Sequence, residues 1–336
     1  MPGVSTEQSS AAGEQTVSQV DEAAIIALLQ QHYPVTTQGV EIGPGDDAAA
    51  LHLPTGRVLT TVDTLVQGLD FLPVWPCGYR TTGEDLGYKS AAQNLSDINA
   101  MGGVPRAGFV TLSLPPDTPL SWVAGYARGV AQAAADLGAD RFGVLGGDLS
   151  SAGELQIGMT VLGEAEGPVL TRSGARPGDR LLVAGEVLGA ADAALSLLTS
   201  ATPPRGVGQR VLQALFRPRP PLGAGAAPGL TAGLDLSDGL VRDAARLASA
   251  SGVALALGEA ELEVEAERLR EFAGEWAGDA LRRVLYGGED FLLLATCRGV
   301  DPVPDGFRQI GEVREGSGVW LGRRELTTEQ GWDHFG

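Results

Sequence analysis

The sequence predicts an α/β protein built from two domains. It has 336 residues, and domains usually span about 100–200 residues. Short apolar runs typical of strands alternate with stretches whose apolar residues follow helical spacing, and Gly- and Pro-rich loops separate them. A connector at residues 164–179 interrupts this alternation. We therefore expect a disordered tail at residues 1–20, an N-terminal domain at 21–166 and a C-terminal α/β domain at 167–336.

The N-terminal half is expected to begin with a helix and to continue with alternating strands and helices. Residues 21–31 carry apolar side chains at helical spacing. Thr82 and Asp85 stand three residues apart, as in a capping box, and open a helix that continues to Ala100. The remaining elements are strands at 58–62, 107–114, 141–145 and 155–163, and an alanine-rich helix at 120–137.

The C-terminal half restarts the alternation with a strand at 181–184. A helix is expected at 190–199. Ser237 is expected to cap another at 238–250, which stops at Gly252, a residue type favoured just after a helix end. Residues 201–208 and 217–229 are rich in Pro and Gly and predict loops. Short strands are expected at 234–236, 253–257, 291–296 and 319–321.

The composition argues against several classes of protein. A net charge of −18 makes nucleic acid an unfavourable partner, because such binding depends on Lys and Arg neutralising phosphates. Cys77 and Cys297 lie far apart without metal-ligand spacing, so we expect neither disulfides nor structural zinc. No apolar run approaches the ~20 residues that cross a bilayer, and the first residues lack signal-peptide features. We therefore expect a cytoplasmic protein that binds no membrane.

Acidic residues recur at glycine-rich or helix-capping turns in both halves. One such turn is ordinary, but repetition at expected strand ends favours a shared cleft, because open α/β sheets bind ligands beyond the carboxyl ends of their strands. Two carboxylates about 4 Å apart repel by about 4 kcal/mol at an effective dielectric of 20, and Mg²⁺ would relieve that repulsion. The turns are Gly45-Asp46-Asp47, Thr61-Val62-Asp63, Ser96-Asp97, Gly146-Gly147-Asp148, Asp235-Leu236-Ser237-Asp238-Gly239 and Gly287-Gly288-Glu289-Asp290.

The common nucleotide-binding and catalytic patterns are missing. There is no GxxxxGK[ST] loop, no protein-kinase catalytic loop, no GxGxxG after a strand and no histidine in a triad pattern. Lys89 is the single lysine among 24 basic residues. Two interpretations of Lys89 stay open: an accident of composition, or a compact point charge for phosphate beside the polar helix face of Asn94 and Asp97.

Seven segments resemble, in the same order, the motifs of the thiamine-monophosphate kinase family, and they span nearly everything from the first helix to Phe335. They are Gly-Pro-Gly-Asp-Asp-Ala (43–48), Thr-Thr-Val-Asp-Thr-Leu (60–65), Asn-Leu-Ser-Asp-Ile-Asn-Ala-Met-Gly-Gly-Val-Pro (94–105), Gly-Gly-Asp (146–148), Asp-Leu-Ser-Asp-Gly-Leu (235–240), Gly-Gly-Glu-Asp-Phe (287–291) and Gly-Trp-Asp-His-Phe (331–335). The resemblance implies ATP-dependent phosphorylation of thiamine monophosphate to thiamine diphosphate by direct in-line transfer.

The same resemblance implies the two-domain fold of aminoimidazole ribonucleotide synthetases. In that fold an N-terminal mixed sheet binds ATP and Mg²⁺ and forms a barrel across a homodimer, and a C-terminal α/β domain follows. The implied ligands are several Mg²⁺ ions, with ATP as co-substrate and thiamine monophosphate as acceptor; K⁺ is left open as a further cation.

Carried over onto matching positions, the resemblance also assigns site residues. The implied metal ligands are Asp47, Thr61, the Val62 backbone, Asp63, Asp97, Asp148, Asp235 and Asp238, of which Asp148 and Asp238 are expected to be most critical. The implied ATP contacts are Gly147, Asp148, Arg172 and Ser237. The implied substrate contacts are Asp70, Glu289 and Trp332, although Trp332 could equally clasp the C-terminus. No general base is expected, because a phosphate monoester with a second pKa of about 6 is mostly deprotonated at pH 7.

One departure and two alternatives remain at this point. Asp70 stands where the family often has histidine, and an anion there would suit the cationic part of the substrate. A sister ATP-dependent synthetase of the same fold is the nearer alternative. The chain lacks the Cys and Lys of selenophosphate synthetase and the terminal Cys of the hydrogenase-maturation protein, and its ending does not suit an aminoimidazole ribonucleotide synthetase. A non-catalytic nucleotide- or calcium-binding scaffold is the alternative from another class.

Overall fold

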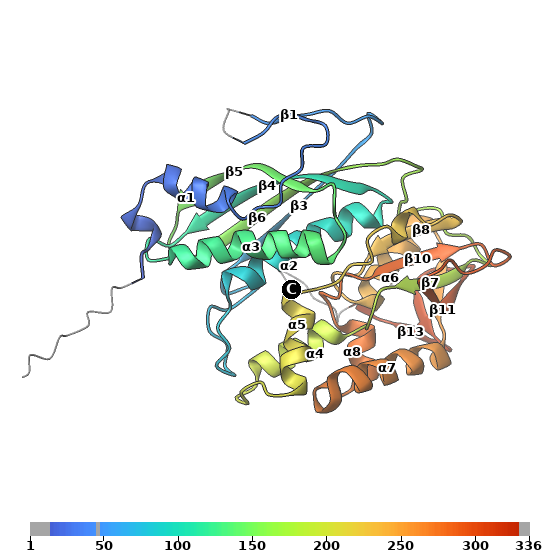
Figure 1. Ribbon diagram of the computed structural model, residues 1–336. Helices are drawn as coiled ribbons and strands as arrows, with labels where there is room; N and C mark the ends of the chain where they lie inside the picture. Colours follow the sequence, from blue (N-terminus) through green and yellow to red (C-terminus); the bar gives the residue numbers. More distant parts are fainter. Residues whose placement is uncertain (1–13, 45–47, 329–336) are drawn as a thin grey trace, which may run out of the picture.

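A four-stranded sheet from the N-terminal half and a seven-stranded sheet from the C-terminal half organise the chain (Figure 1). The computed structural model describes residues 14–44 and 48–328. The smaller sheet has the order β3-β6-β4-β5, with β4 and β5 parallel and the other pairs antiparallel, so the expected mixed sheet is confirmed. Its strands are Val58–Val66 (β3), Val104–Leu114 (β4), Gly143–Ser151 (β5) and Gln156–Glu164 (β6).

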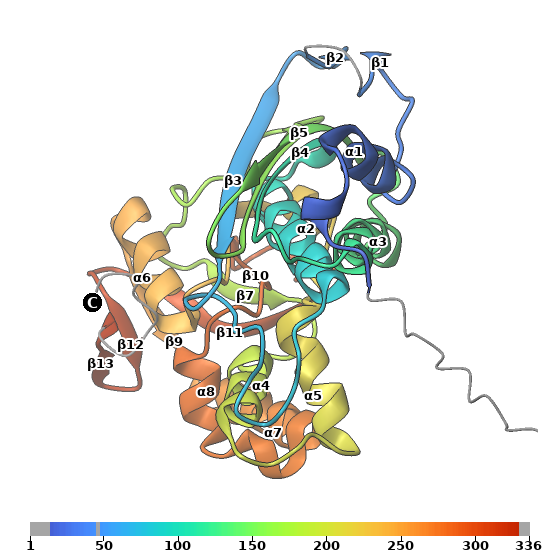
Figure 2. The same cartoon turned by 90° about the vertical axis from the view of Figure 1, so that its left-hand side faces the viewer.

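Helix α2, Gly83–Ala100, lies between the two sheets (Figure 2). Its expected capping box is present, since the Thr82 hydroxyl accepts from the Asp85 N–H and the Asp85 carboxylate accepts from the Thr82 N–H. α2 packs on the smaller sheet beside α3, Leu120–Asp136, and also contacts β8 of the larger sheet. Glycine permits the close approach of α3, because a Cβ at Gly87 would lie 2.0 Å from the Tyr126 carbonyl oxygen. α2 therefore carries polar residues into the region where the two halves meet.

The other face of the smaller sheet is left open by the described helices. β3 alternates between buried Leu59 and Leu65 on the helix side and exposed residues on the open side, where Val62 is 65% exposed. Thr111 on β4 and Asp148 on β5 are exposed as well. β3 and β5 are the two edge strands. The expected barrel across a homodimer would use this face and these edges, and it stays a prediction.

The larger sheet has the order β13-β12-β9-β11-β7-β10-β8, in which only β9 and β12 are parallel neighbours. Its strands are Arg180–Ala184 (β7), Leu230–Asp235 (β8), Ala254–Leu257 (β9), Leu293–Cys297 (β10), Phe307–Arg314 (β11), Val319–Leu321 (β12) and Arg324–Leu326 (β13). The helices of this half are Ala190–Thr199 (α4), Val207–Phe216 (α5), Leu240–Ser251 (α6), Glu259–Ala273 (α7) and Ala280–Tyr286 (α8). A short N-terminal helix, Glu22–Gln30 (α1), and the strand pair Val40–Ile42 (β1) and Ala50–Leu51 (β2) complete the main elements.

Several expectations about local structure need correction. β3 and β5 run beyond their expected ends, so Asp63, Gly147 and Asp148 lie within strands and not in turns. The Gly146-Gly147 pair looks like a turn in sequence, yet Gly147 sits so close to β4 that a Cβ would lie 2.0 Å from the Val110 carbonyl oxygen. Gly239 is the N-cap of α6, which starts at Leu240, so Ser237 does not cap this helix. α5, α7, α8, β1, β2, β11 and β13 were not expected from the sequence.

The first residues differ from the expected tail where they are described. Val17–Gln19 form a 3₁₀ helix, and the Val17 N–H donates to the Thr118 carbonyl. Residues 1–13 lie outside the described part. None of the described helices combines the length and apolar character needed to cross a membrane.

Candidate active site

Two cavities lie where the two halves of the chain meet. The larger, of about 780 Å³, is bounded by β3 and the loop after it on one side, and by the loop before α6 and the loop at residues 287–291 on the other. The smaller, of about 520 Å³, lies among β3, α2 and β8. Arg172, from the connector between the sheets, lines both. The two cavities therefore share a lining residue and are adjoining parts of one candidate site.

Three of the predicted metal ligands converge here from three different elements. Asp63 comes from β3, Asp97 from the last turn of α2, and Asp235 from the end of β8. The Thr61 hydroxyl donates to Asp97 Oδ2 at 2.5 Å, and the Ser96 hydroxyl donates to Asp235 Oδ2 at 3.1 Å. The sequence places these residues far apart, and the packing of α2 between the two sheets brings them together.

The electrostatics of this cluster disfavour three bare carboxylates. Burial, with a further contribution from the charge of Asp97, raises the pKa of Asp63 to about 7. Burial also raises the pKa of Asp235 well above its usual value, and the charges of Asp97 and Asp243 add to this. The pKa of Asp97 is raised by burial against the opposing effects of Thr61 and Arg172. The cluster therefore favours protons or cations over ionised side chains alone.

The donor set fits a hard divalent cation, although the described residues do not preassemble a site for one. All the predicted side-chain ligands are carboxylate or hydroxyl oxygens, the ligand type that Mg²⁺ prefers. Within residues 14–44 and 48–328, no three His, Cys, Asp or Glu side chains are already grouped to hold a metal ion. Asp47, a further predicted ligand, falls outside these ranges.

Asp238 lines the larger cavity together with Arg246, which the sequence analysis did not single out, and Arg246 connects it to the buried Asp243. Arg246 bonds to both Asp238 and Asp243, and the Asp238 N–H donates to Asp243 Oδ2 at 2.9 Å. Burial raises the pKa of Asp243 to about 6, and the Arg246 charge opposes that shift. The signal was present in sequence as an Asp–Arg pair three residues apart, on a helix that directly follows the Asp235–Gly239 segment. Ser237, a predicted ATP contact, also lines this cavity.

The predicted substrate contacts that are described lie at the larger cavity. The Asp70 carboxylate accepts from the Val66 N–H at 2.7 Å, so it closes a local turn in addition to lining the cavity. Glu289 lines the cavity and forms an ion pair of 2.5 Å with Lys89, which lines neither cavity. In this structure Lys89 therefore pairs with a carboxylate at the cavity wall and does not itself line either cavity. Trp332 lies outside the described residues.

An aromatic wall in the larger cavity was not predicted. It is made of Phe71, Trp75, Tyr286 and Phe291. The Trp75 indole N–H donates to the Thr81 hydroxyl at 2.9 Å, which fixes the ring. In sequence, Phe71 and Trp75 belong to an apolar stretch with neither strand nor helix period, and such stretches give no signal of a cavity wall. Flat rings of this kind suit an aromatic or cationic ligand.

Gly147 and Asp148 are not brought to this site within one chain. They lie on β5, and Asp148 faces Thr111 of β4. β3 is separated from β5 by β6 and β4, so the two edge strands are about 14 Å apart at the usual spacing of neighbouring strands. The Asp148 carboxylate accepts from the Ser150 hydroxyl at 3.3 Å. The cleft assembled by one chain therefore lacks a residue that was expected to be among its most critical.

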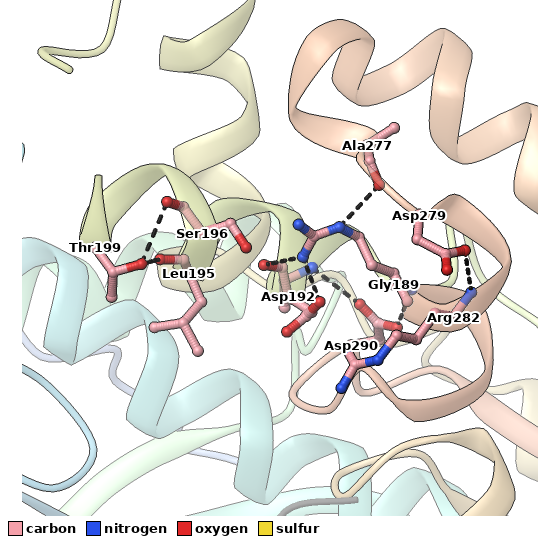
Figure 3. A network of polar contacts seen from close by, with 11 residues as sticks. Gly189, Asp192, Leu195, Ser196, Thr199, Ala277, Asp279, Arg282 and Asp290 are labelled. Carbon is pink, nitrogen blue, oxygen red and sulfur yellow. Dashed lines mark hydrogen bonds and ion pairs between the residues drawn. The ribbon is translucent and has the colours of Figure 1, made fainter. Parts of the chain in front are cut away.

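Asp290, next to Glu289, is fully engaged in holding the structure. Its carboxylate accepts from the backbone N–H of Gly189 at 2.5 Å and of Ala191 at 3.1 Å, at the start of α4 (Figure 3). Burial raises its pKa to about 7, while these N–H donors act in the opposite direction. Nearby, Arg283 pairs with Asp192 and donates to the Ala277 carbonyl. The loop that carries Glu289 is thereby tied to α4.

Comparisons with known proteins first define the class of fold. The family model described as AIR synthase related protein, N-terminal domain, matches residues 45–165. The solved structure of AaThiL complexed with AMPPCP and TMP aligns with a TM-score of 0.72 at 28% identity, covering 96% of this chain and all of the other. The chain therefore has the AIR synthase-type α/β fold, as the sequence predicted.

Curated relatives then define the family. Thiamine-monophosphate kinase of Mycobacterium tuberculosis (strain ATCC 25618 / H37Rv) is 37% identical over 96% of this chain and 93% of its own length. The Corynebacterium glutamicum protein of the same name is 35% identical over 95% of both chains. The chain belongs to the thiamine-monophosphate kinase family. The resemblance seen in its motifs is thus confirmed.

Proposed function

We propose that the protein transfers the γ-phosphoryl group of ATP to thiamine monophosphate and so forms thiamine diphosphate and ADP. The observation that carries the proposal is Arg172, which lines both cavities. The smaller cavity holds Asp97 and Asp235, and the larger holds Asp63 and Asp238 together with the aromatic wall. An arginine between two anionic groups binds phosphate oxygens through its forked N–H donors. Relatives covering nearly the whole chain bear the name of this activity, and one structure holds AMPPCP and TMP.

Magnesium ions fit the acidic part of the site. Asp63, Asp97, Asp235, Asp238 and the Thr61 hydroxyl would hold them, and the predicted ligands Asp47, Asp148 and the Val62 backbone would complete the set. The oxygen-only donors and the raised pKa values of Asp63 and Asp235 support this assignment. When bound, Mg²⁺ supplies positive charge that offsets the phosphates of both substrates. The additional K⁺ stays a prediction.

The residues of the chain position the two substrates. Arg172, Ser237 and Gly147 are the proposed nucleotide contacts, while the aromatic wall, Asp70, Glu289 and Trp332 take the organic part of thiamine monophosphate. A phosphate oxygen of thiamine monophosphate forms the new bond to the γ-phosphorus as the bond to the β–γ bridging oxygen breaks and ADP leaves. That oxygen is already deprotonated at pH 7, so no general base is needed. Direct transfer should invert the configuration at phosphorus, and net retention would contradict it.

A homodimer would complete the site. In the arrangement we propose, the two-fold axis runs along the barrel, so the edge strand β5 of one subunit lies beside β3 of the other and brings Asp148 of the partner subunit towards Asp63. Mixing inactive Asp63→Asn protein with inactive Asp148→Asn protein tests this, because subunit exchange then creates one site with both residues intact. Recovered activity supports sharing between subunits. No recovery despite exchange, or a monomer in sedimentation, contradicts it.

The first experiment measures ADP release at fixed ATP and Mg²⁺, with and without thiamine monophosphate, with mass detection of thiamine diphosphate. We expect turnover that requires thiamine monophosphate and stops with EDTA. Binding of Mg-ATP without formation of thiamine diphosphate would contradict the proposed acceptor and favour the sister-synthetase alternative. The cytoplasmic location, supported by two free buried cysteines, and the domain boundary at 166/167 stay proposals.

A further inference from the structure

Lys89 occupies an unusual place for a lysine. Its side chain is 1% exposed, on helix α2, and it is the single lysine of the chain. Removing an ammonium group from water is costly unless a partner compensates its charge. In the part of the chain that the structure describes, Lys89 forms an ion pair with Glu289, 200 positions away in the other half.

Glu289 is held in a strained conformation at the wall of the larger cavity. Its φ is +64°, in the left-handed region that non-glycine residues seldom adopt, and its side chain is 37% exposed. The backbone is fixed on both sides, since the Glu289 N–H donates to the Ser237 carbonyl at 2.7 Å and Asp290 bonds to the start of α4. A glycine would relieve the strain, so a glutamate here indicates a use for the carboxylate.

One hydrogen bond links the buried Lys89 to the strained Glu289. Lys89 Nζ bonds to Oε1 of Glu289, and Oε2 has no protein partner among the described residues. The backbone of Glu289 belongs to the C-terminal half, whereas its carboxylate is directed by a helix of the N-terminal half. The carboxylate therefore has one oxygen committed to Lys89 and the other left for a ligand in the cavity.

We propose that Lys89 is a positioning residue that aims the Glu289 carboxylate at the donor-bearing, cationic organic part of the acceptor substrate. The inference deepens the proposed function and rests on it. Lys89 lines neither cavity, so it acts through Glu289 and not by touching phosphate. A purely stabilising role explains the pair poorly, because buried ion pairs are often replaceable by apolar residues without loss of stability.

The experiment compares the steady-state kinetics of Lys89→Met, Lys89→Arg, Glu289→Gln and the double variant Lys89→Met/Glu289→Gln with those of the native chain. KM for thiamine monophosphate and KM for ATP are measured separately, and Tm is recorded for each protein. Ser90→Ala is the matched control, because Ser90 is equally buried on α2 and bonds to Gly87 and Tyr126 without touching Glu289.

We expect Lys89→Met to raise KM for thiamine monophosphate about tenfold, the usual effect of losing one charged hydrogen bond, with KM for ATP within about threefold. Lys89→Arg should recover much of the loss, since it keeps the charge. The double variant should match Glu289→Gln alone, because Lys89 has no effect once its partner is neutral. Ser90→Ala should keep both KM values.

Three results would overturn the inference: an unchanged KM for thiamine monophosphate in Lys89→Met, an equal rise in both KM values, or independent, multiplicative effects in the double variant. If Lys89→Met does not fold, Lys89→Arg and the double variant decide between the same outcomes. Failure of the proposed function is distinguishable, because the native chain would then show no turnover with thiamine monophosphate.

Discussion

Asp63 and Asp290 are two acidic side chains with the same shifted pKa and opposite surroundings. Burial raises the pKa of each to about 7. Asp290 directs both oxygens at backbone N–H groups at the start of α4. The Asp63 carboxylate has no hydrogen-bond partner in the described part of the chain, and its neighbour is another carboxylate, Asp97.

The difference shows that a raised pKa does not by itself mark a functional residue. Buried polar groups that serve the fold are normally satisfied by the protein, as Asp290 is. A buried carboxylate that faces another carboxylate without donors is unfavourable for the empty protein, and a bound cation would relieve it. The surroundings of Asp63 thus favour binding of a cation over a role in stabilising the fold.

The largest expected effect is the loss of catalysis caused by the substitution Asp63→Asn, and measuring it would sharpen this contrast. We expect kcat/KM to fall by about 10³-fold or more, because one carboxylate of the proposed metal cluster is lost. In EDTA, the free energy of unfolding should stay the same or rise, since the repulsion from Asp97 is removed. Activity assays and denaturant unfolding in EDTA measure the two effects.

An exposed carboxylate provides the control for Asp63→Asn. Asp305 lies on the surface between β10 and β11, far in sequence from every predicted ligand. Asp305→Asn removes the same charge and should leave both activity and unfolding unchanged. The contrast with Asp290 would not hold under one outcome. In that outcome Asp63→Asn unfolds more easily than the native chain in EDTA, and its loss of activity is no larger than the unfolded fraction explains.

The next effect is on stability. Asp290→Asn should lower the free energy of unfolding by about 2 kcal/mol, because an amide nitrogen cannot accept from the Gly189 and Ala191 N–H groups. The native pKa of Asp290 lies above its unfolded value, so the folded state binds more protons and this contribution rises as pH falls from about 7 towards 4. Asparagine lacks this titration.

The deficit of Asp290→Asn should therefore be larger at pH 5 than at pH 8. Urea unfolding of both proteins at the two pH values measures it. A deficit that shrinks towards pH 5 would mean that the ionised form of Asp290 is the stabilising one, contrary to the shift of its pKa.

The smallest effect is expected at an exposed carboxylate that has a charged partner. Glu84 on α2 pairs with Arg128 on α3 at 2.9 Å, with both side chains more than 40% exposed. Water screens such pairs, so Glu84→Gln should change the free energy of unfolding by no more than about 0.5 kcal/mol and leave activity intact. A loss of stability as large as that of Asp290→Asn would show that the exposure of a charged pair does not predict how much the pair contributes to the free energy of unfolding.

Local signals in the chain were sufficient for the elements that depend on neighbouring residues. The capping box of Thr82 and Asp85, the course of α2 and the stop of α6 at Gly252 were all predicted, because each depends on contacts within a few residues. The ordered acidic motifs likewise indicated the family, since a motif can be read without knowing how the chain folds.

Tertiary packing decided the strand register and the meeting of distant side chains. Gly147 and Asp148 looked like turn residues, yet the pairing of β5 with β4 extends the strand through them. The ion pair of Lys89 with Glu289 and the cluster of Asp63, Asp97 and Asp235 join residues from separate elements. No local pattern encodes these contacts, because they exist only when the sheets close around α2.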